Sequence, residues 1–93
     1  MKKYTFNNIE YELIENKRDA FSNEEVIEKC TEYFMTYDYI VGDWSYGKLR
    51  LKGFCEKGNE NYNRINDYSN KEEYLKNNCA FQCRYFILKK LSN

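Results

Sequence analysis

Residues 37–54 read YDYIVGDWSYGKLRLKGF and contain the only Trp and three of the four glycines of the chain. Residues 37–41 are apolar at almost every position and predict a central strand that is buried on both faces. Residues 42–47 predict a turn, in which Gly47 supplies a positive φ. Residues 48–55 predict the return strand. We expect this hairpin to organise the whole fold.

The predicted return strand has two unlike faces, because successive side chains of a strand point to opposite sides. One face is apolar and the other is basic. We expect the apolar face to meet the helices and the basic face to lie on the opposite, open side. The apolar face holds Leu49, Leu51 and Cys55, and the basic face holds Lys48, Arg50 and Lys52.

The segment before residue 37 predicts a second hairpin and a helix. Residues 3–15 alternate around Asn7-Asn8, a pair that tolerates the positive φ of a two-residue type I′ turn. Ser22 and Glu25 form a capping-box pattern at the start of a helix that we expect over residues 23–35. The predicted buried stripe of this helix is Val26, Ile27, Cys30, Tyr33, Phe34 and Tyr37.

The segment after residue 55 predicts a loop, a short helix and a closing strand. Residues 56–67 are rich in Asn, Gly and charge, with an expected short edge strand at 62–65. A second capping-box pattern, Ser69 with Glu72, predicts a helix over residues 70–77 that buries Tyr74 and Leu75. Residues 81–90 predict the last strand. The fold class is therefore α+β, a mostly antiparallel sheet of four or five strands with two helices packed on it.

The composition restricts the chemistry. The chain has no His, which removes the commonest general base at neutral pH, and its formal net charge is zero. No overall basic field therefore draws it to nucleic acid or to a membrane. The N-terminus lacks the apolar run of a secretory signal, and no apolar run is long enough to span a bilayer. We expect a cytoplasmic protein with reduced cysteines.

Residues 37–54 resemble the signature of the YutD-like family of small bacterial proteins. Residues 12–16 are similar to the N-terminal strand of that family, and residues 79–88 are similar to its C-terminal strand. Ser45 and Gln82 stand where the family pattern has Gly. The resemblance implies one compact α+β domain over residues 1–93 in the bacterial cytoplasm. It implies no reaction, so no catalytic residue is carried over.

The basic face beside the predicted turn is the leading candidate for a binding surface. Cations that pair with phosphates, next to aromatic rings that stack on bases, are the ingredients of single-stranded RNA recognition on a sheet. The same face also suits a protein partner with an acidic surface, and a merely solvated outer face is the third interpretation. The candidate binding residues are Asp43, Trp44, Tyr46, Lys48, Arg50, Lys52 and Tyr85.

The alternative is a small enzyme or a metal-binding protein that uses Asp43 or Cys79/Cys83. Asp38 and Asp43 are five residues apart, and this odd separation places them on opposite faces of a regular strand. The C-x3-C pair, with Cys30 and Cys55, allows a four-thiolate zinc site, although zinc sites favour C-x2-C pairs and buried thiols act as small hydrophobes. We expect no cofactor and no catalytic residue.

Overall fold

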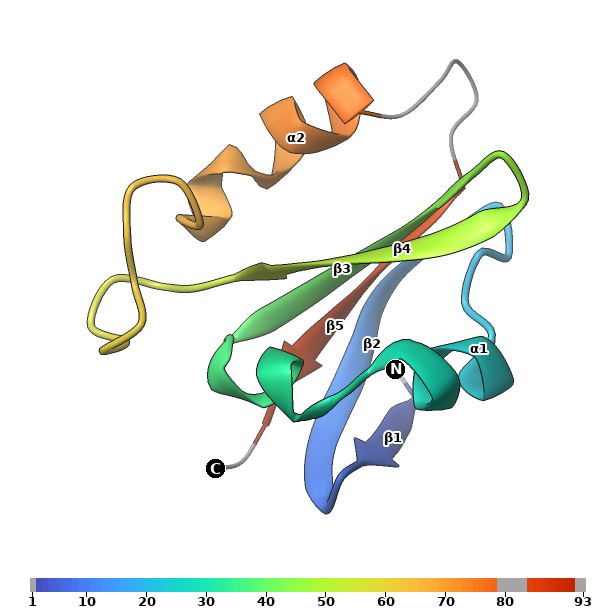
Figure 1. The fold of residues 1–93 in the computed structure, drawn as a ribbon, viewed down its shortest axis with the longest axis horizontal. Helices are drawn as coiled ribbons and strands as arrows, with labels where there is room; N and C mark the ends of the chain where they lie inside the picture. The colour runs from blue at the N-terminus through green and yellow to red at the C-terminus, as the bar shows by residue number, and fades with distance from the viewer. Residues whose placement is uncertain (1, 79–83, 92–93) are drawn as a thin grey trace.

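The computed structural model describes residues 2–78 and 84–91, which form an α+β fold around one five-stranded antiparallel sheet (Figure 1). The strand order is β1-β2-β5-β3-β4, so the last strand in the sequence is the central strand of the sheet. The predicted fold class is confirmed. The strands are β1 (Lys3–Phe6), β2 (Ile9–Lys17), β3 (Tyr39–Ser45), β4 (Lys48–Phe54) and β5 (Tyr85–Lys90).

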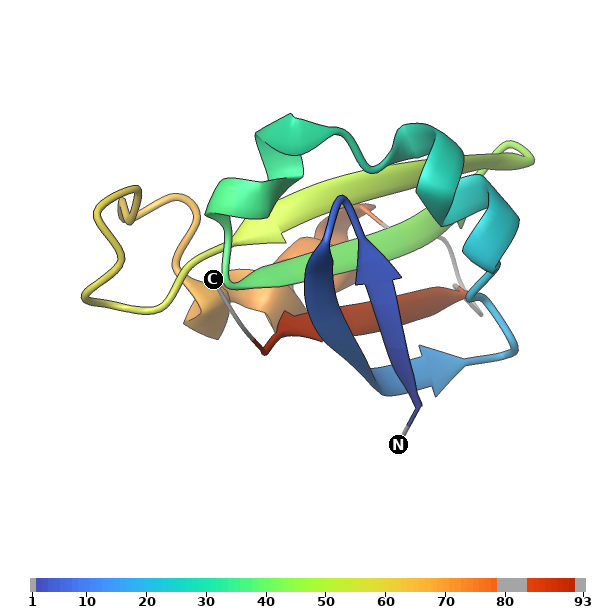
Figure 2. The same ribbon diagram turned by 90° about the horizontal axis from the view of Figure 1, so that it is seen from below.

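The helices cover both faces of the sheet, and this corrects the expectation that one face stays open. Helix α1 (Asn23–Lys29) and the 3-10 helix η1 (Glu32–Thr36) lie on one face, whereas η2 (Tyr68–Asn70) and α2 (Lys71–Asn78) lie on the other (Figure 1 and Figure 2). The reason is that β3 and β5 are apolar on both sides. A strand of this kind must be covered on both faces to remove its apolar area from water.

Each face of the sheet has its own hydrophobic core. The core under α1 and η1 includes Tyr11, Leu13, Val26, Cys30, Ile40, Leu49, Phe86 and Leu88, with Trp44 and Leu51 at its margin. The core under α2 is smaller and includes Tyr39, Val41, Phe54 and Ile87, against which Tyr74 and Leu75 pack. The predicted buried side of the second helix is therefore confirmed.

The first hairpin agrees with its prediction. Asn7 and Asn8 have φ values of 53° and 67°, as a type I′ turn requires, and Phe6 pairs with Ile9 across it. Tyr11 is fully buried, so the apolar side of β2 faces the core as expected.

The predicted helix over residues 23–35 is wrong in length, because α1 ends at Lys29 and a separate 3-10 turn follows. Ser22 caps its start and accepts a hydrogen bond from the Glu25 amide at 3.5 Å. At its end, the Cys30 carbonyl accepts a hydrogen bond from the Asn7 side chain at 2.9 Å. This side-chain donor satisfies a carbonyl that a continuous helix would have used itself. In the predicted stripe, Ile27 and Tyr33 are 59% and 65% exposed rather than buried.

The central hairpin has a longer first strand and a shorter turn than predicted, and its return strand, β4, ends at Phe54, one residue before the predicted end. Strand β3 continues to Ser45, and the turn consists of Tyr46 and Gly47, with φ values of 52° and 75°. Gly42, which we expected in the turn, lies inside β3 under the Phe86 ring. A Cβ at this position would come within 2.1 Å of that ring. Gly42 therefore serves close packing between strands rather than turning.

The segment between β4 and α2 contains no strand over residues 62–65, which corrects that expectation. Its Asn side chains bond to the backbone instead: Asn63 accepts from the Asn66 amide, and Asn66 accepts from the Asn63 amide, both at 2.8 Å. The turn before α2 is capped by Asp67, which accepts from the Ser69 amide at 2.9 Å, rather than by Ser69. Residues 81–83 of the predicted last strand lie outside the described residues.

Candidate functional site

Strand β4 forms one edge of the sheet, with β3 as its neighbour on the inner side. Ser45 pairs with Lys48 across the two-residue turn, and in such a hairpin these two residues exchange backbone hydrogen bonds. The backbone N–H and C=O groups of Lys48, Arg50 and Lys52 therefore bond to β3. The backbone groups of the residues between them point away from β3, toward the outer side of the sheet. Within residues 2–78 and 84–91, no strand pairs with this outer side. The outward backbone groups belong to Leu49, Leu51 and Gly53.

The chain itself closes the far end of this edge. The Cys55 amide donates to the Asn66 carbonyl at 2.8 Å, and the Tyr68 amide donates to the Cys55 carbonyl at 2.9 Å. These bonds form a single parallel bridge between Cys55 and Asp67. The open part of the edge is thus β4 itself, bounded by the Tyr46–Gly47 turn at one end and by this bridge at the other.

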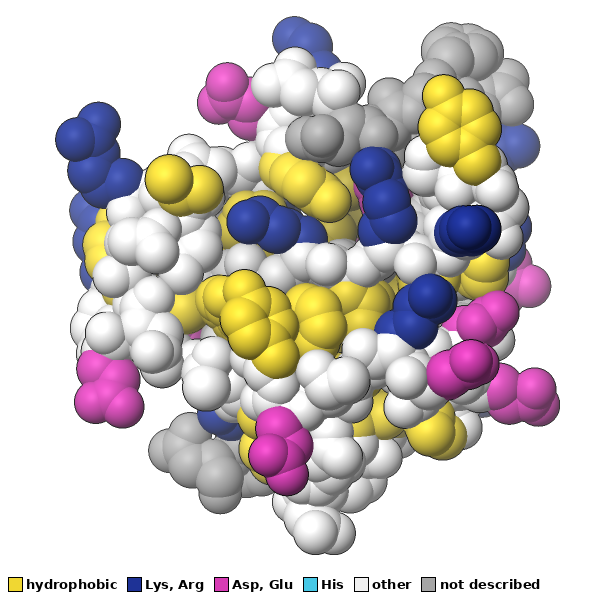
Figure 3. Space-filling model, viewed as in Figure 1, with side chains coloured by type: hydrophobic (Ala, Val, Ile, Leu, Met, Phe, Trp, Pro, Cys, Tyr) yellow, Lys and Arg dark blue, Asp and Glu magenta, His cyan; other side chains and the backbone are white. Residues whose placement is uncertain are grey.

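The side chains of β4 divide by type across the edge. Figure 3 looks onto this edge and shows a row of basic side chains above β4 and a band of hydrophobic side chains below it. The basic row lies on the α2 face of the sheet, and the hydrophobic band lies on the α1 face. Lys48 is exposed, whereas Lys52 is partly buried, with its Nζ 5.8 Å from the centre of the Phe54 ring.

Arg50 is bound to Asp43, the residue opposite it on β3. Its Nε donates to Asp43 Oδ1 at 3.1 Å and its Nη2 donates to Oδ2 at 2.9 Å, which is the bidentate geometry of strong pairs. The Asp43 side chain is 1% exposed and the Arg50 side chain is 41% exposed. The hydrogen bonds to Asp43 raise the pKa of Arg50. The Arg50 guanidinium is thus held by Asp43, and Lys48 and Lys52 are the other two cations on this face of β4.

Trp44 lies on the opposite face of the sheet from these cations, and the expectation that it flanks them is wrong. It pairs with Leu49 on the α1 face and packs at the margin of that core. Its Nε1 donates to the Ala20 carbonyl at 2.8 Å, and the Arg84 guanidinium lies 5.2 Å from its ring centre. The reason is parity, because consecutive residues of β3 point to opposite faces once the strand continues through this position.

The two candidate tyrosines have different surroundings. Tyr46 occupies the turn and is fully exposed, so it is accessible at the end of the edge. Tyr85 lies on the same face as the cations but two strands away from β4, where its hydroxyl donates to Glu15 at 2.8 Å. Burial and this hydrogen bond raise the pKa of Tyr85. Tyr46 therefore belongs to the edge, and Tyr85 does not.

A shallow hollow lies between β4 and α2, beside Lys52. Its volume is about 450 Å³, and Phe54, Tyr74 and the 79% exposed Ile65 contribute apolar walls, with Glu73 at its margin. No pattern in the sequence indicates this hollow, since it depends on where α2 lies over the sheet. It extends the candidate surface from the strand edge onto the helix.

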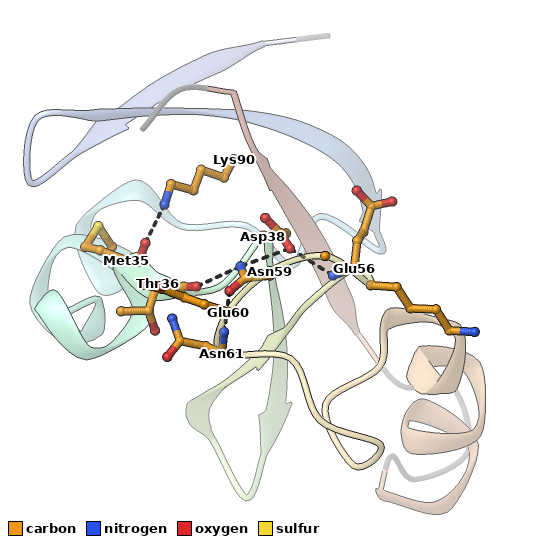
Figure 4. A pocket seen from close by; sticks show the side chains of 10 residues that line it. Met35, Thr36, Asp38, Glu56, Asn59, Glu60, Asn61 and Lys90 are labelled. Atoms are coloured by element: carbon orange, nitrogen blue, oxygen red, sulfur yellow. Dashed lines mark hydrogen bonds between the residues drawn. The ribbon is translucent and has the colours of Figure 1, made fainter.

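Asp38 is separate from Asp43 and has a structural environment of its own. One of its carboxylate oxygens accepts hydrogen bonds from the Glu56 amide at 2.8 Å and from the Asn59 side chain at 3.1 Å (Figure 4). These bonds hold the 56–61 loop beside a polar hollow of about 690 Å³. The carboxylates of Asp38 and Asp43 therefore form no shared site. This agrees with the prediction from their separation of five residues, which places them on opposite faces of a strand.

The cysteines offer no site in the part of the chain that is described. Cys30 and Cys55 are free thiols and are buried, as expected, and burial raises the pKa of Cys30 to about 11. Cys79 and Cys83 lie outside the described residues. Among residues 2–78 and 84–91, no group of three or more acidic, Cys or His side chains is placed to hold a metal ion.

The fold and the edge together define a class, a small α+β protein with an amphipathic edge strand and helices on both faces of its sheet. Residues 5–89 match the family described as "Putative antitoxin YutD-like", and the chain belongs to this family. It is 42% identical over 84 residues to "Putative antitoxin YutD" of Bacillus subtilis, covering 90% of this chain and 92% of that protein.

A solved structure agrees with this assignment. The solution NMR structure of protein yutD from B. subtilis is 38% identical and superposes with a TM-score of 0.82, covering 100% of this chain and 84% of that one. The family resemblance inferred from residues 37–54 is therefore confirmed. None of the described helices is long and apolar enough to cross a membrane.

Proposed function

We propose that this chain is a non-enzymatic, cytoplasmic antitoxin-type protein that acts by binding a protein partner. The description of its family as antitoxin supports a role exerted through a partner. The observation that carries the proposal is the outer edge of β4, where Lys48, Lys52 and Tyr46 surround backbone groups that no strand in the described part of the chain pairs with. An exposed edge strand is a ready template for pairing with another chain.

A protein partner is favoured over RNA by the position of the aromatic rings. Recognition of single-stranded RNA on a sheet needs rings that stack on bases beside the cations that pair with phosphates. Trp44 lies on the opposite face, and Tyr85 is hydrogen-bonded to Glu15. The formal net charge of zero also favours local charge complementarity over a general attraction to phosphate.

The enzymatic alternative is disfavoured by the state of Asp43. A carboxylate that acts as a general acid or base has to reach a substrate. Asp43 instead is buried and receives two hydrogen bonds from Arg50. This arrangement supports a structural role for the pair within the binding surface.

The test is affinity capture from lysate of the source bacterium with three forms of the chain. Lys48→Ser/Lys52→Ser removes two cations of β4, and Lys3→Ser/Lys57→Ser removes two exposed cations outside the strand, one on β1 and one in the loop that follows β4. We expect the wild type and the Lys3/Lys57 control to retain a protein that the Lys48/Lys52 variant loses. Retention should survive RNase. Loss on RNase treatment would instead assign an RNA partner, and equal capture by all three forms would contradict a role for this edge.

A further inference from the structure

We infer that the partner binds by β-strand addition, in which an extended acidic segment pairs with β4 and becomes the sixth strand of the sheet. This inference rests on the proposed function and specifies how the same edge is used. Three features of the edge carry it: its outward backbone groups, its two-sided side chains, and the charge that excludes a second copy of this chain.

The outer side of β4 carries backbone groups that a further strand could pair with. The outward N–H and C=O groups of Leu49, Leu51 and Gly53 repeat at the spacing of a strand ladder. Beyond them, Cys55 already bonds on this side to residues 66 and 68. The outer side of the strand therefore already forms backbone hydrogen bonds at one end, and the incoming segment would pair with the part that the described residues leave open.

The side chains specify what kind of segment fits. An added strand places its side chains alternately on the two faces of the sheet. On the α2 face they meet Lys48 and Lys52, so acidic residues are favoured there. On the α1 face they meet Leu51 and the Tyr37 ring, which covers Gly53, so apolar residues are favoured there. The segment is thus an alternation of acidic and apolar residues.

A second copy of this chain is a poor occupant of the same edge. Antiparallel pairing of two β4 strands continues each face into its counterpart, so the basic rows of both copies would lie side by side. Every register that pairs most of the strand sets Lys52 opposite a cation of the other copy, namely Lys48, Arg50 or Lys52. Like charges directly opposite destabilise a strand pair. The edge thereby discourages self-association and accepts an acidic segment of another protein.

The opposite edge of the sheet offers much less. Strand β1 has only four residues, Lys3–Phe6, against seven in β4, and it ends at the Asn7–Asn8 turn. A short edge of this kind gives few backbone bonds to an added strand. This contrast places the interaction at β4.

The first experiment uses a synthetic eight-residue peptide of alternating Glu and Val, added to the ¹⁵N-labelled full chain. Amide hydrogen exchange at Leu49, Leu51 and Gly53 should be fast in the free protein and slowed by the peptide. Exchange at Arg50 and Lys52, whose amides bond to β3, should stay slow throughout. No slowing at millimolar peptide, or slowing confined to other residues, would overturn strand addition.

Two matched changes separate backbone pairing from charge attraction. N-methylation of alternate peptide residues on the edge that faces β4 removes its donors and should weaken binding about tenfold or more. An alternating Lys and Val peptide should not bind, because its charges repel Lys48 and Lys52. Equal affinity for the N-methylated and unmodified Glu peptides would overturn the inference. The peptide changes require no mutation, so they do not depend on the folding of a variant.

The captured partner distinguishes this inference from the proposed function. Suppose that the Lys48→Ser/Lys52→Ser variant fails to capture a partner that the wild type binds, but the amides of Leu49, Leu51 and Gly53 still exchange fast in the wild-type complex. Strand addition is then wrong, and the proposed binding role stands. If the partner binds all forms equally, the proposed function itself fails. Slowed exchange at the three amides in the partner complex supports both.

Discussion

Asp43 and Arg50 face each other across β3 and β4, and the buried carboxylate receives both arms of a partly exposed guanidinium. This pair fixes the basic row of β4 against the sheet and lies close to Tyr74 of α2, whose pKa is raised by its burial and by the charge of Asp43. It therefore links the edge strand to the helix above it. Its role in stability can be separated from any role in binding.

The first prediction concerns this pair. Arg50→Met leaves the buried Asp43 carboxylate without its guanidinium, so we expect the free energy of unfolding to fall by about 2–3 kcal/mol. Lys48→Met on the same face should change it by less than about 0.5 kcal/mol, because Lys48 is exposed. Urea unfolding at pH 7 gives both values. The double variant Asp43→Leu/Arg50→Met should recover part of the stability that Arg50→Met loses. If the double variant instead loses the sum of what Asp43→Leu and Arg50→Met lose separately, the two side chains are not energetically coupled.

The second prediction separates Trp44 from Tyr46. Trp44→Phe removes the hydrogen bond to the Ala20 carbonyl and should cost about 1 kcal/mol of stability, with partner capture unchanged. Tyr46→Ala removes a fully exposed ring at the edge and should leave stability within about 0.5 kcal/mol while weakening capture. Circular dichroism during urea unfolding measures the stabilities. Loss of capture by Trp44→Phe in a folded protein would show that the binding surface includes the α1 face.

The third prediction compares two glycines with close aromatic neighbours. A Cβ at Gly42 would lie 2.1 Å from the Phe86 ring, and one at Gly53 would lie 2.3 Å from the Tyr37 ring. Phe86 is fully buried at the centre of the sheet, whereas Tyr37 is partly exposed and can swing outward. We expect Gly42→Ala to cost about 2–3 kcal/mol and Gly53→Ala about 1 kcal/mol. Thermal unfolding checks the order, which equal costs would contradict.

The fourth prediction concerns alkaline pH. Burial raises the pKa of the Cys30 thiol from 9.0 to about 11, so the folded chain holds this proton more tightly than the unfolded chain does. Stability from this group is fully present below pH 9 and is lost as the pH rises toward 11, by about 3 kcal/mol in total. Urea unfolding at pH 8.5 and pH 10 measures the loss. Cys30→Ala should show a smaller loss over this interval, and an identical loss would assign the effect to other groups.

The local patterns of the sequence predicted the elements that depend on neighbouring residues. Asn7-Asn8 defines a turn by its tolerance of positive φ, and the alternation after Gly47 defines the faces of β4. The same local patterns predict a first helix that is too long. Helix α1 can end at Lys29 because the side chain of Asn7, which is distant in sequence, donates a hydrogen bond to the Cys30 carbonyl. The local patterns also place Trp44 on the wrong face of the sheet, because they assign Gly42 to a turn. The real reason for this glycine is the Phe86 ring on another strand.

Periodicities of two and 3.6 residues along the chain were enough to predict the class of fold and the division of β4 into a basic and an apolar side. The family was identified from the resemblance of residues 37–54 to its signature. Three features follow from the folded structure alone: β4 is an edge strand, α2 covers part of its basic side, and Arg50 is bound to Asp43. These depend on the strand order and on contacts between segments far apart in the chain. No local pattern encodes which strand has a neighbour on one side only.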